Sequence, residues 1–318
     1  MDMSLSELEA YTGSGIKAAD FDEYWARALD ALDAVDPQAE LLPAAFPLSS
    51  AECFDLYFTG VGGARIHAKY LRPKTPGKHP CGLYFHGYTY FSGDWSLLLP
   101  YVAEGMCIAA LDCRGQTGLS RDVTVINGST IDPHLMRGID DDPDKLIFRQ
   151  NYLDTVEMAR IVEKFDEVDP DRMAAFGGSQ GGGLALACSA LYGKTKLTVC
   201  EVPFLADFYR GWQTRENLLP DSAYREIALY FSRHDPLHQR EKEIFEKMSY
   251  FDVQYLAPRI RSRVVMSTGL QDGIVPPSTQ YAIYNRLTCE KEHYVYPEHG
   301  HETATGWPDI QLQLLRGV

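Results

Sequence analysis

The sequence has no uninterrupted apolar run long enough to span a membrane. A transmembrane helix needs about 18 or more consecutive apolar residues, and no stretch of the chain reaches that length. The N-terminal segment MDMSLSELEAYTGSG has acidic residues and lacks the apolar core and small-residue cleavage site of a secretory signal. We therefore expect a soluble, cytoplasmic protein that has no membrane partner.

Positive charge is also scarce. The chain carries 30 Lys and Arg against 44 Asp and Glu, a formal net charge of -14. Such a surplus of negative charge repels phosphate backbones and anionic lipid. The composition therefore argues against a nucleic-acid partner.

Closely spaced cysteine pairs are missing as well. The seven cysteines are odd in number and scattered, and none forms a CxxC pair. This distribution disfavours a disulfide framework or a zinc site and predicts buried, reduced thiols. We expect no metal and no other cofactor.

Neither internal repeats nor low-complexity linkers divide the chain. With 45% apolar and 23% charged residues, the 318-residue sequence has the composition of an ordinary globular protein. A chain of this length buries about three quarters of its unfolded surface, so a large core is available. We predict one α/β domain over 1–318, with an N-terminal helical extension over 1–50.

Short apolar runs alternate with helical periods along most of the chain. Two strand-like runs within 53–71 flank the glycine-rich segment 60–63, which predicts an antiparallel hairpin. Further strands are expected at 81–86, 106–112, 172–176, 197–201, 263–268 and 293–296. Helices are expected at 21–32, 95–104, 151–165, 181–192 and 278–287. The order predicts a mostly parallel central sheet with helices on both faces.

Two segments are longer than ordinary connections. Segment 113–150 is rich in Asp, Gly and Pro, and segment 203–258 has the pattern of a helical insertion. Long excursions from an α/β sheet usually shape a binding site or a subunit contact, although a solvated decoration is the alternative.

The run Gly177-Gly178-Ser179-Gln180-Gly181 is a G-x-S-x-G motif between a predicted strand and a predicted helix. In a nucleophile elbow, glycines allow a sharp strand-to-helix turn that exposes the serine oxygen at the sheet edge. A packing turn or a phosphate loop is the alternative, but the P-loop pattern is absent. Ser179 is the candidate nucleophile.

A serine nucleophile needs a base and a group that orients the base. Asp272 follows the predicted strand 263–268, at the edge where Ser179 is expected; a turn aspartate is the alternative. His299 and His301 both follow the last predicted strand. Gly300 suits a loop bending just before His301, which favours it over His299 as the base. A metal site at His-x-His is disfavoured because no other ligands cluster nearby.

Acyl transfer also needs hydrogen-bond donors for the oxyanion. The motif predicts the backbone N–H of Gln180 as one donor and that of Tyr88, in the loop after strand 81–86, as the other. His86 is expected to be structural. The tentative wall of the acyl pocket, with core packing as the alternative, comprises Tyr90, Phe91, Trp95 and Ile274.

These motifs resemble carbohydrate esterase family seven, the acetyl xylan esterase and cephalosporin C deacetylase group of α/β-hydrolases. The resemblance is carried by Arg114-Gly115-Gln116, the run from Gly177 to Gly182, Asp272 in Asp-Gly-Ile-Val-Pro-Pro-Ser-Thr, and His301-Glu302. Supporting similarities are Phe21-Asp22-Glu23-Tyr24-Trp25, His86-Gly87-Tyr88 and Ser249-Tyr250-Phe251-Asp252, so the resemblance spans nearly the whole chain.

The resemblance implies an α/β-hydrolase fold and a metal-free serine esterase that removes acetyl groups from acetylated saccharides and from cephalosporin C. The alternatives are another serine hydrolase of the same fold that acts on larger esters, lactones or peptides, and a catalytically silent binding scaffold, which the intact Ser, Asp and His disfavour. The resemblance also implies Ser179, Asp272 and His301 as the triad and a hexamer of identical subunits. Arg114 and Gln116 would be scaffold residues behind the site, and Glu302 would brace the histidine loop. The chain differs from the group in a short C-terminal tail, with Trp307-Pro308 where a longer final helix is expected.

Overall fold

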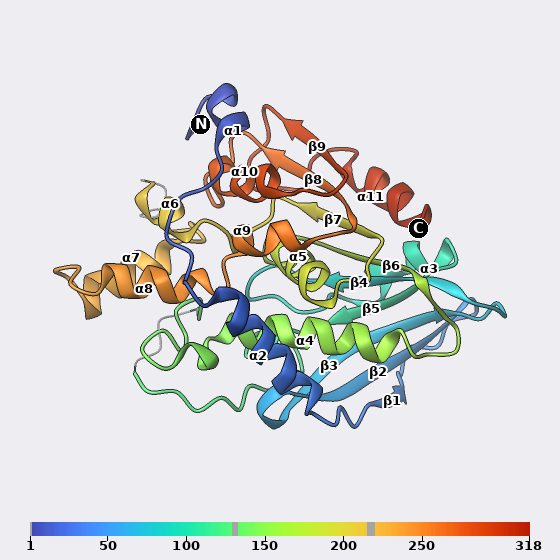
Figure 1. The fold of residues 1–318 in the computed structure, drawn as a ribbon. Helices are drawn as coiled ribbons and strands as arrows, with labels where there is room; N and C mark the ends of the chain where they lie inside the picture. Colours follow the sequence, from blue (N-terminus) through green and yellow to red (C-terminus); the bar gives the residue numbers. More distant parts are fainter. Residues whose placement is uncertain (1, 129–132, 215–219) are drawn as a thin grey trace.

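One nine-stranded sheet forms the centre of the molecule (Figure 1). The structure is a computed structural model and describes residues 2–128, 133–214 and 220–318. The strand order is β1-β2-β3-β5-β4-β6-β7-β8-β9, antiparallel from β1 to β5 and parallel from β5 to β9. The strands are β1 Glu40–Pro43, β2 Ala51–Gly60, β3 Ala64–Pro73, β4 His79–Phe85, β5 Cys107–Leu111, β6 Val168–Gly178, β7 Leu197–Glu201, β8 Arg263–Gly269 and β9 Lys291–Tyr296.

Helices cover both faces of the sheet, as the alternation of apolar runs predicts (Figure 1). The helices are α1 Leu5–Ala10, α2 Phe21–Asp33, α3 Trp95–Ala103, α4 Ile147–Val162, α5 Gln180–Tyr192, α6 Phe208–Gln213, α7 Arg225–His234, α8 Glu241–Ser249, α9 Val253–Leu256, α10 Pro277–Arg286 and α11 Trp307–Arg316. Short 3-10 turns are η1 Val61–Gly63, η2 Pro143–Lys145 and η4 Ala257–Arg259.

Alternate side chains of the inner strands enter two different cores. In β4, Leu83 and Phe85 join the larger core with residues of α2, α4 and α5. Tyr84 packs on the opposite side, in the core that contains Leu98 of α3 and Trp307 of α11. Because both faces are covered, the inner strands read as continuous apolar runs rather than as alternating ones.

The chain ends in a helix, which corrects the expectation of a short tail without one. Helix α11 begins at Trp307, and Pro308 occupies its first turn. Proline is tolerated there because the first N–H groups of a helix have no intrahelical acceptor. Strand β1 and helix α1 were not expected from the sequence, and α4 begins at Ile147 rather than at residue 151.

The N-terminal segment is bound to the helical insertion through Asp207. The hydroxyls of Tyr11 and Ser14 each donate to the Asp207 carboxylate, at 2.6 Å. Helix α2 then lies over α4, where the rings of Trp25 and Tyr152 stack with centroids 5.9 Å apart. These contacts attach the N-terminal extension to Asp207, at the start of α6, and to α4.

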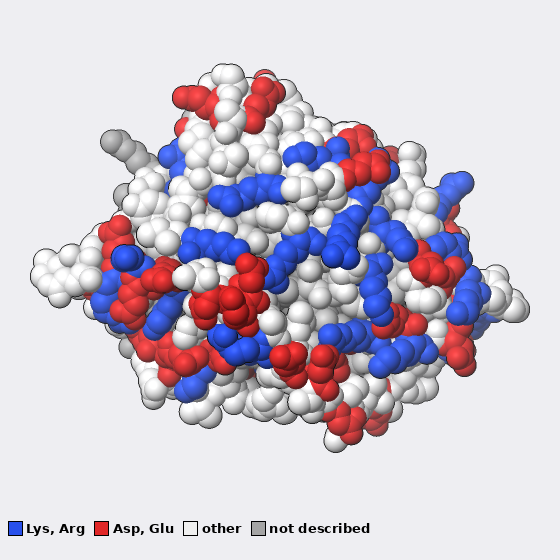
Figure 2. Space-filling model, viewed as in Figure 1, with Lys and Arg blue, Asp and Glu red and all other residues white. Residues whose placement is uncertain are grey.

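Charges of both signs are interspersed on the face that α2 and α4 cover. Figure 2 shows a band of Lys and Arg across this face, with acidic side chains beside it. Ion pairs such as Arg160–Asp33, at 2.7 Å, connect the two signs. Within the described ranges, no helix is both long enough and apolar enough to cross a bilayer.

Candidate active site

Ser179 lies in a sharp turn between β6 and α5. Its backbone has φ 54° and ψ -121°, a conformation that costs energy for a residue with a side chain. A Cβ atom at Gly177 or Gly181 would lie 2.4 or 2.0 Å from the carbonyl oxygen of Phe85. Only glycine fits at these two positions, so the motif lets the elbow pack directly against β4 while the serine stands at the carboxyl edge of the sheet.

The side chain of His301 lies within hydrogen-bond distance of both Ser179 and Asp272. His301 Nε2 is 2.9 Å from Ser179 Oγ, and His301 Nδ1 is 2.7 Å from Asp272 Oδ2. Because an ionised carboxylate only accepts, Nδ1 carries the proton and Nε2 is free to accept one from the serine. His299 makes no such contact; its ring packs on Tyr296, with centroids 5.3 Å apart.

Asp272 is itself held on both carboxylate oxygens. Its Oδ1 accepts the backbone N–H groups of Ile274 and Val275, at 3.0 and 2.8 Å. Its Oδ2 accepts Gln280 Nε2, at 3.0 Å, in addition to His301. The carboxylate is buried, so these four donors fix its orientation and that of the imidazole.

Gln116 connects the loop after β4 to the elbow. Its Oε1 accepts the backbone N–H of Thr89 at 2.8 Å, and its Nε2 donates to Gln180 Oε1 at 2.7 Å. Gln180 is the first residue of α5, so its own backbone N–H has no intrahelical acceptor. His86 has a structural contact: its Nε2 accepts the Cys113 N–H at 3.0 Å.

Arg114 lies deeper in the fold than a surface turn would place it. Its side chain is buried and pairs with Asp154 of α4, while Nη1 donates to the carbonyl of Val61 at 3.2 Å. Glu302, in contrast, is exposed and only accepts a long hydrogen bond of 3.4 Å from the Gly300 N–H.

Glu201, at the end of β7, contacts both the elbow and the loop after His301, and sequence reasoning did not identify it. Its carbonyl accepts the Ser179 N–H at 2.8 Å, and its Oε2 accepts the Thr303 hydroxyl at 3.2 Å. Burial raises the pKa of this carboxyl to about 7. The sequence signal that could have identified Glu201 is an acidic residue at the end of an otherwise apolar strand.

A cavity of about 400 Å³ opens beside Ser179 and His301. Its lining comprises Gly87, Tyr88, Thr89, Pro133, Ser179, Phe204, Pro220, Asp221, Ser222, Ala223, Arg225, Glu226, Leu229, Ile274 and His301. Of the four residues expected to wall an acyl pocket, only Ile274 is among them. Tyr90 is 62% exposed and stacks on Phe91, and Trp95 stacks on Phe46.

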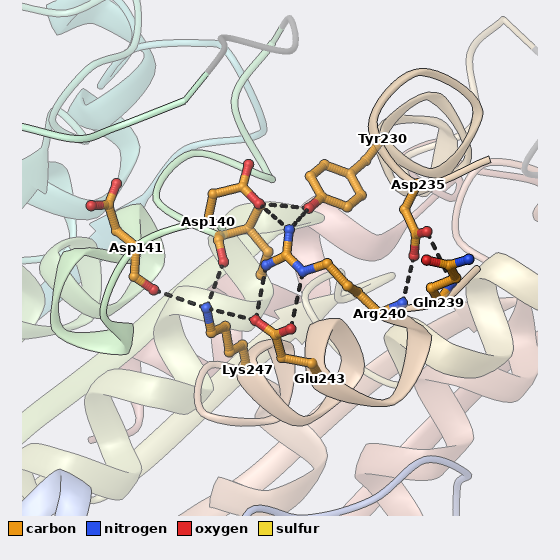
Figure 3. A network of polar contacts seen from close by, with 9 residues as sticks. Asp140, Asp141, Tyr230, Asp235, Gln239, Arg240, Glu243 and Lys247 are labelled. Atoms are coloured by element: carbon orange, nitrogen blue, oxygen red, sulfur yellow. Dashed lines mark hydrogen bonds and ion pairs between the residues drawn. The ribbon is translucent and has the colours of Figure 1, made fainter. Parts of the chain in front are cut away.

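Polar contacts connect segment 113–150 to segment 203–258 (Figure 3). The described parts of both segments contribute to the cavity. Asp140 accepts Arg240 Nη1 at 2.7 Å and the Tyr230 hydroxyl at 2.6 Å. Lys247 Nζ donates to the carbonyls of Ile139 and Asp141, at 3.1 and 3.0 Å. The helical insertion therefore packs over the site; residues 129–132 and 215–219 of these segments lie outside the described ranges.

All seven cysteines are unpaired, and six of them are buried. Among residues 2–128, 133–214 and 220–318, no three His, Cys, Asp or Glu side chains form a group that could hold a metal ion.

The family comparison and the solved structures indicate the same protein family. The sequence profile of the acetyl xylan esterase family (AXE1) matches residues 1–316. Acetyl xylan esterase 1 from Thermoanaerobacterium sp. JW/SL YS485 is 49% identical, with a TM-score of 0.97 over 100% of this chain and 99% of that one. Acetyl xylan esterase from Paenibacillus sp. R4 is 35% identical, with a TM-score of 0.93 over 99% of both chains.

Two more distant proteins are also similar to this chain, at lower sequence identity. Acetyl esterase Axe7A of Xylanibacter ruminicola is 25% identical over 93% of this chain, which spans 66% of that protein's length. The α/β hydrolase GrgF from Penicillium sp. sh18 is 14% identical, with a TM-score of 0.56 over 83% of this chain and 98% of that one. The latter likeness concerns the fold alone and agrees with the expected α/β-hydrolase architecture.

Proposed function

The chain belongs to the acetyl xylan esterase family, and on that premise we propose that it is a serine esterase that removes acetyl groups from acetylated xylo-oligosaccharides. The observation that carries this proposal is the position of His301, within 2.9 Å of Ser179 Oγ and 2.7 Å of Asp272 Oδ2 beside an open cavity. Cephalosporin C, which also carries an acetyl ester, is proposed as a second substrate.

In the first half of the reaction, Ser179 Oγ attacks the acetyl carbonyl carbon while His301 Nε2 takes the serine proton. The backbone N–H groups of Tyr88 and Gln180 stabilise the resulting oxyanion. The tetrahedral intermediate then breaks its bond to the sugar oxygen, and His301 returns the proton to that oxygen. The products of this half are the free sugar hydroxyl and an acetyl-enzyme.

In the second half, water attacks the acetyl-enzyme and gives its proton to His301. Collapse of the second tetrahedral intermediate releases acetate, and Ser179 Oγ takes the proton back. Asp272 stays ionised throughout and stabilises the imidazolium that forms in each half. No step needs a metal or a redox cofactor.

The substrate class and the nucleophile are tested together with a panel of esters. We expect an aryl acetate and acetylated xylo-oligosaccharides to be hydrolysed much faster than an aryl butyrate or octanoate. Ser179→Ala should lower kcat by several orders of magnitude while the protein stays folded. Faster hydrolysis of octanoate than of acetate, or near-normal turnover by folded Ser179→Ala, contradicts the proposal.

A homo-hexamer and a cytoplasmic location are finer proposals that rest on the family resemblance and the sequence. Light scattering coupled to size exclusion measures the first, with a mass of six times 35.7 kDa expected. Fractionation of cells that express the full chain measures the second.

A further inference from the structure

Glu226 is a buried carboxylate on the wall of the active-site cavity that the reaction scheme does not use. It lies in the first turn of α7, is 3% exposed, and lines the same cavity as Ser179 and His301. Its Oε1 accepts the hydroxyl of Tyr88 at 2.6 Å, and its Oε2 accepts the backbone N–H of Leu135 at 2.5 Å. The carboxylate thus joins α7 to two other segments.

The Tyr88 hydroxyl is fully engaged by this arrangement. It donates to Glu226 and accepts the backbone N–H of His134 at 3.0 Å. The Tyr88 ring packs between aromatic neighbours, with centroids 5.9 Å from Phe204 and 6.2 Å from Phe148. Both ends of the Tyr88 side chain are therefore held, and the backbone of the loop after β4 is held with it.

We propose that Glu226 is a positioning residue for the oxyanion hole: through the Tyr88 hydroxyl, it holds the loop whose Tyr88 N–H stabilises the oxyanion. The inference rests on the proposed function, which assigns that role to the N–H. It also gives the helical insertion a part in catalysis, because α7 supplies the carboxylate. A misplaced donor weakens the transition state more than the bound substrate, so the effect should fall on kcat.

Replacement of the carboxylate by an amide tests the contact without changing its shape. A carboxylate accepts at both oxygens, whereas an amide accepts at only one, so Glu226→Gln cannot keep both the Tyr88 and Leu135 bonds as they are. Tyr88→Phe removes the same hydroxyl contact from the other side and leaves the backbone N–H in place. Glu157→Gln in α4 is the matched control, since Glu157 is also a buried carboxylate, 5% exposed, and does not contact Tyr88.

For each folded variant we would measure kcat and KM on an aryl acetate and the rate at which a fluorophosphonate labels Ser179. We expect Glu226→Gln and Tyr88→Phe each to lower kcat and the labelling rate about tenfold, with KM within about twofold. The double variant should be no worse than the more impaired single variant, because both remove one interaction. Glu157→Gln should stay within about twofold of the wild type in all three measurements.

The inference is overturned if Glu226→Gln keeps kcat and labelling within twofold of the wild type, or if the effects of the two single variants multiply. If Glu226→Gln does not fold, Tyr88→Phe alone decides, and a normal labelling rate in that variant is the overturning result. A wild-type protein that hydrolyses no acetyl ester refutes the proposed function instead. In that case the labelling rates still test the role of Glu226, because the fluorophosphonate reacts with Ser179 at the same oxyanion site, whichever ester the enzyme hydrolyses.

Discussion

Arg114 and Asp154 form a bidentate ion pair in the protein interior, 2.7 Å from Nε to Oδ2 and 2.6 Å from Nη2 to Oδ1. Both side chains are at most 1% exposed. The pair joins the segment after β5 to α4, and Gln116 lies two residues from Arg114. A charge pair therefore supports the backbone from which Gln116 reaches Thr89 and Gln180.

We expect Asp154→Asn to destabilise the protein by about 3–5 kcal/mol, because it leaves the Arg114 charge buried without a carboxylate. Thermal or denaturant unfolding measures the change. Asp33→Asn is the control: it breaks the exposed pair with Arg160, and its cost should stay within about 1 kcal/mol. Equal losses in the two variants would show that burial of the Arg114 pair does not matter.

Asp272→Asn should lower kcat about 10⁴-fold with little change in fold. Oδ1 accepts two backbone N–H groups, so the amide oxygen of Asn must take that place and the amide nitrogen must face His301. His301 Nδ1 would then accept rather than donate, and the proton would move to Nε2. An imidazole with a proton on Nε2 cannot take the proton of Ser179. A loss smaller than tenfold, measured by steady-state kinetics, contradicts this account.

Gly181→Ala should prevent the elbow from packing on β4. The added Cβ would lie 2.0 Å from the Phe85 carbonyl oxygen, which is backbone and cannot swing away. We expect poor yields of folded protein and loss of esterase activity. Gly273→Ala is the comparison, since its Cβ would meet no atom within 4 Å. A Gly181→Ala protein as stable as Gly273→Ala, by thermal unfolding, would contradict the steric argument.

Local pattern was enough to predict where Ser179, Asp272 and His301 gather. Each of them follows a parallel strand, and the carboxyl ends of parallel strands meet at one edge of a sheet. The proposal that Gln180 supplies the first oxyanion donor also comes from the motif, because Gln180 directly follows the serine.

The cavity wall could not be predicted in the same way. Phe204, Glu226 and Leu229 belong to the helical insertion, and their positions depend on distant contacts such as Arg240 with Asp140. The local hydrophobic periodicity of a sequence does not predict a contact between residues so far apart in the chain.

Tyr90, Phe91 and Trp95 are close in sequence to the loop after β4, which made them reasonable candidates for the acyl pocket. Lys69 Nζ instead lies 5.4 Å from the Phe91 ring centroid and 5.1 Å from that of Trp95. Cation–π contacts with Lys69 of β3 therefore account for the positions of the Phe91 and Trp95 rings. Their closeness in sequence to the loop after β4 could not indicate these contacts.

Three buried carboxyls should each make the folded state less stable as the pH rises from about 4 to 7. Burial raises the pKa values of Glu201, Glu226 and Asp252 to about 7. Between their ordinary values near 4 and pH 7, the folded state binds more protons at these three carboxyls than the unfolded state does, so their contribution to stability falls as the pH rises. Burial lowers the pKa of His293 to about 3, and this imidazole contributes in the opposite direction over part of the same interval. Burial alone would also raise the pKa of Asp112, but hydrogen bonds, chiefly from His67, outweigh it and hold the value at about 2.

Stability should therefore also fall as the pH drops from 4 toward 2, because the unfolded state then binds more protons at Asp112. Melting temperatures measured from pH 3 to pH 9 check both slopes. Asp252→Asn removes one of the three raised carboxyls, so its melting temperature should fall less steeply between pH 5 and pH 8 than that of the wild type. An unchanged slope in Asp252→Asn would show that this buried carboxyl does not contribute to the pH dependence of stability between pH 5 and pH 8.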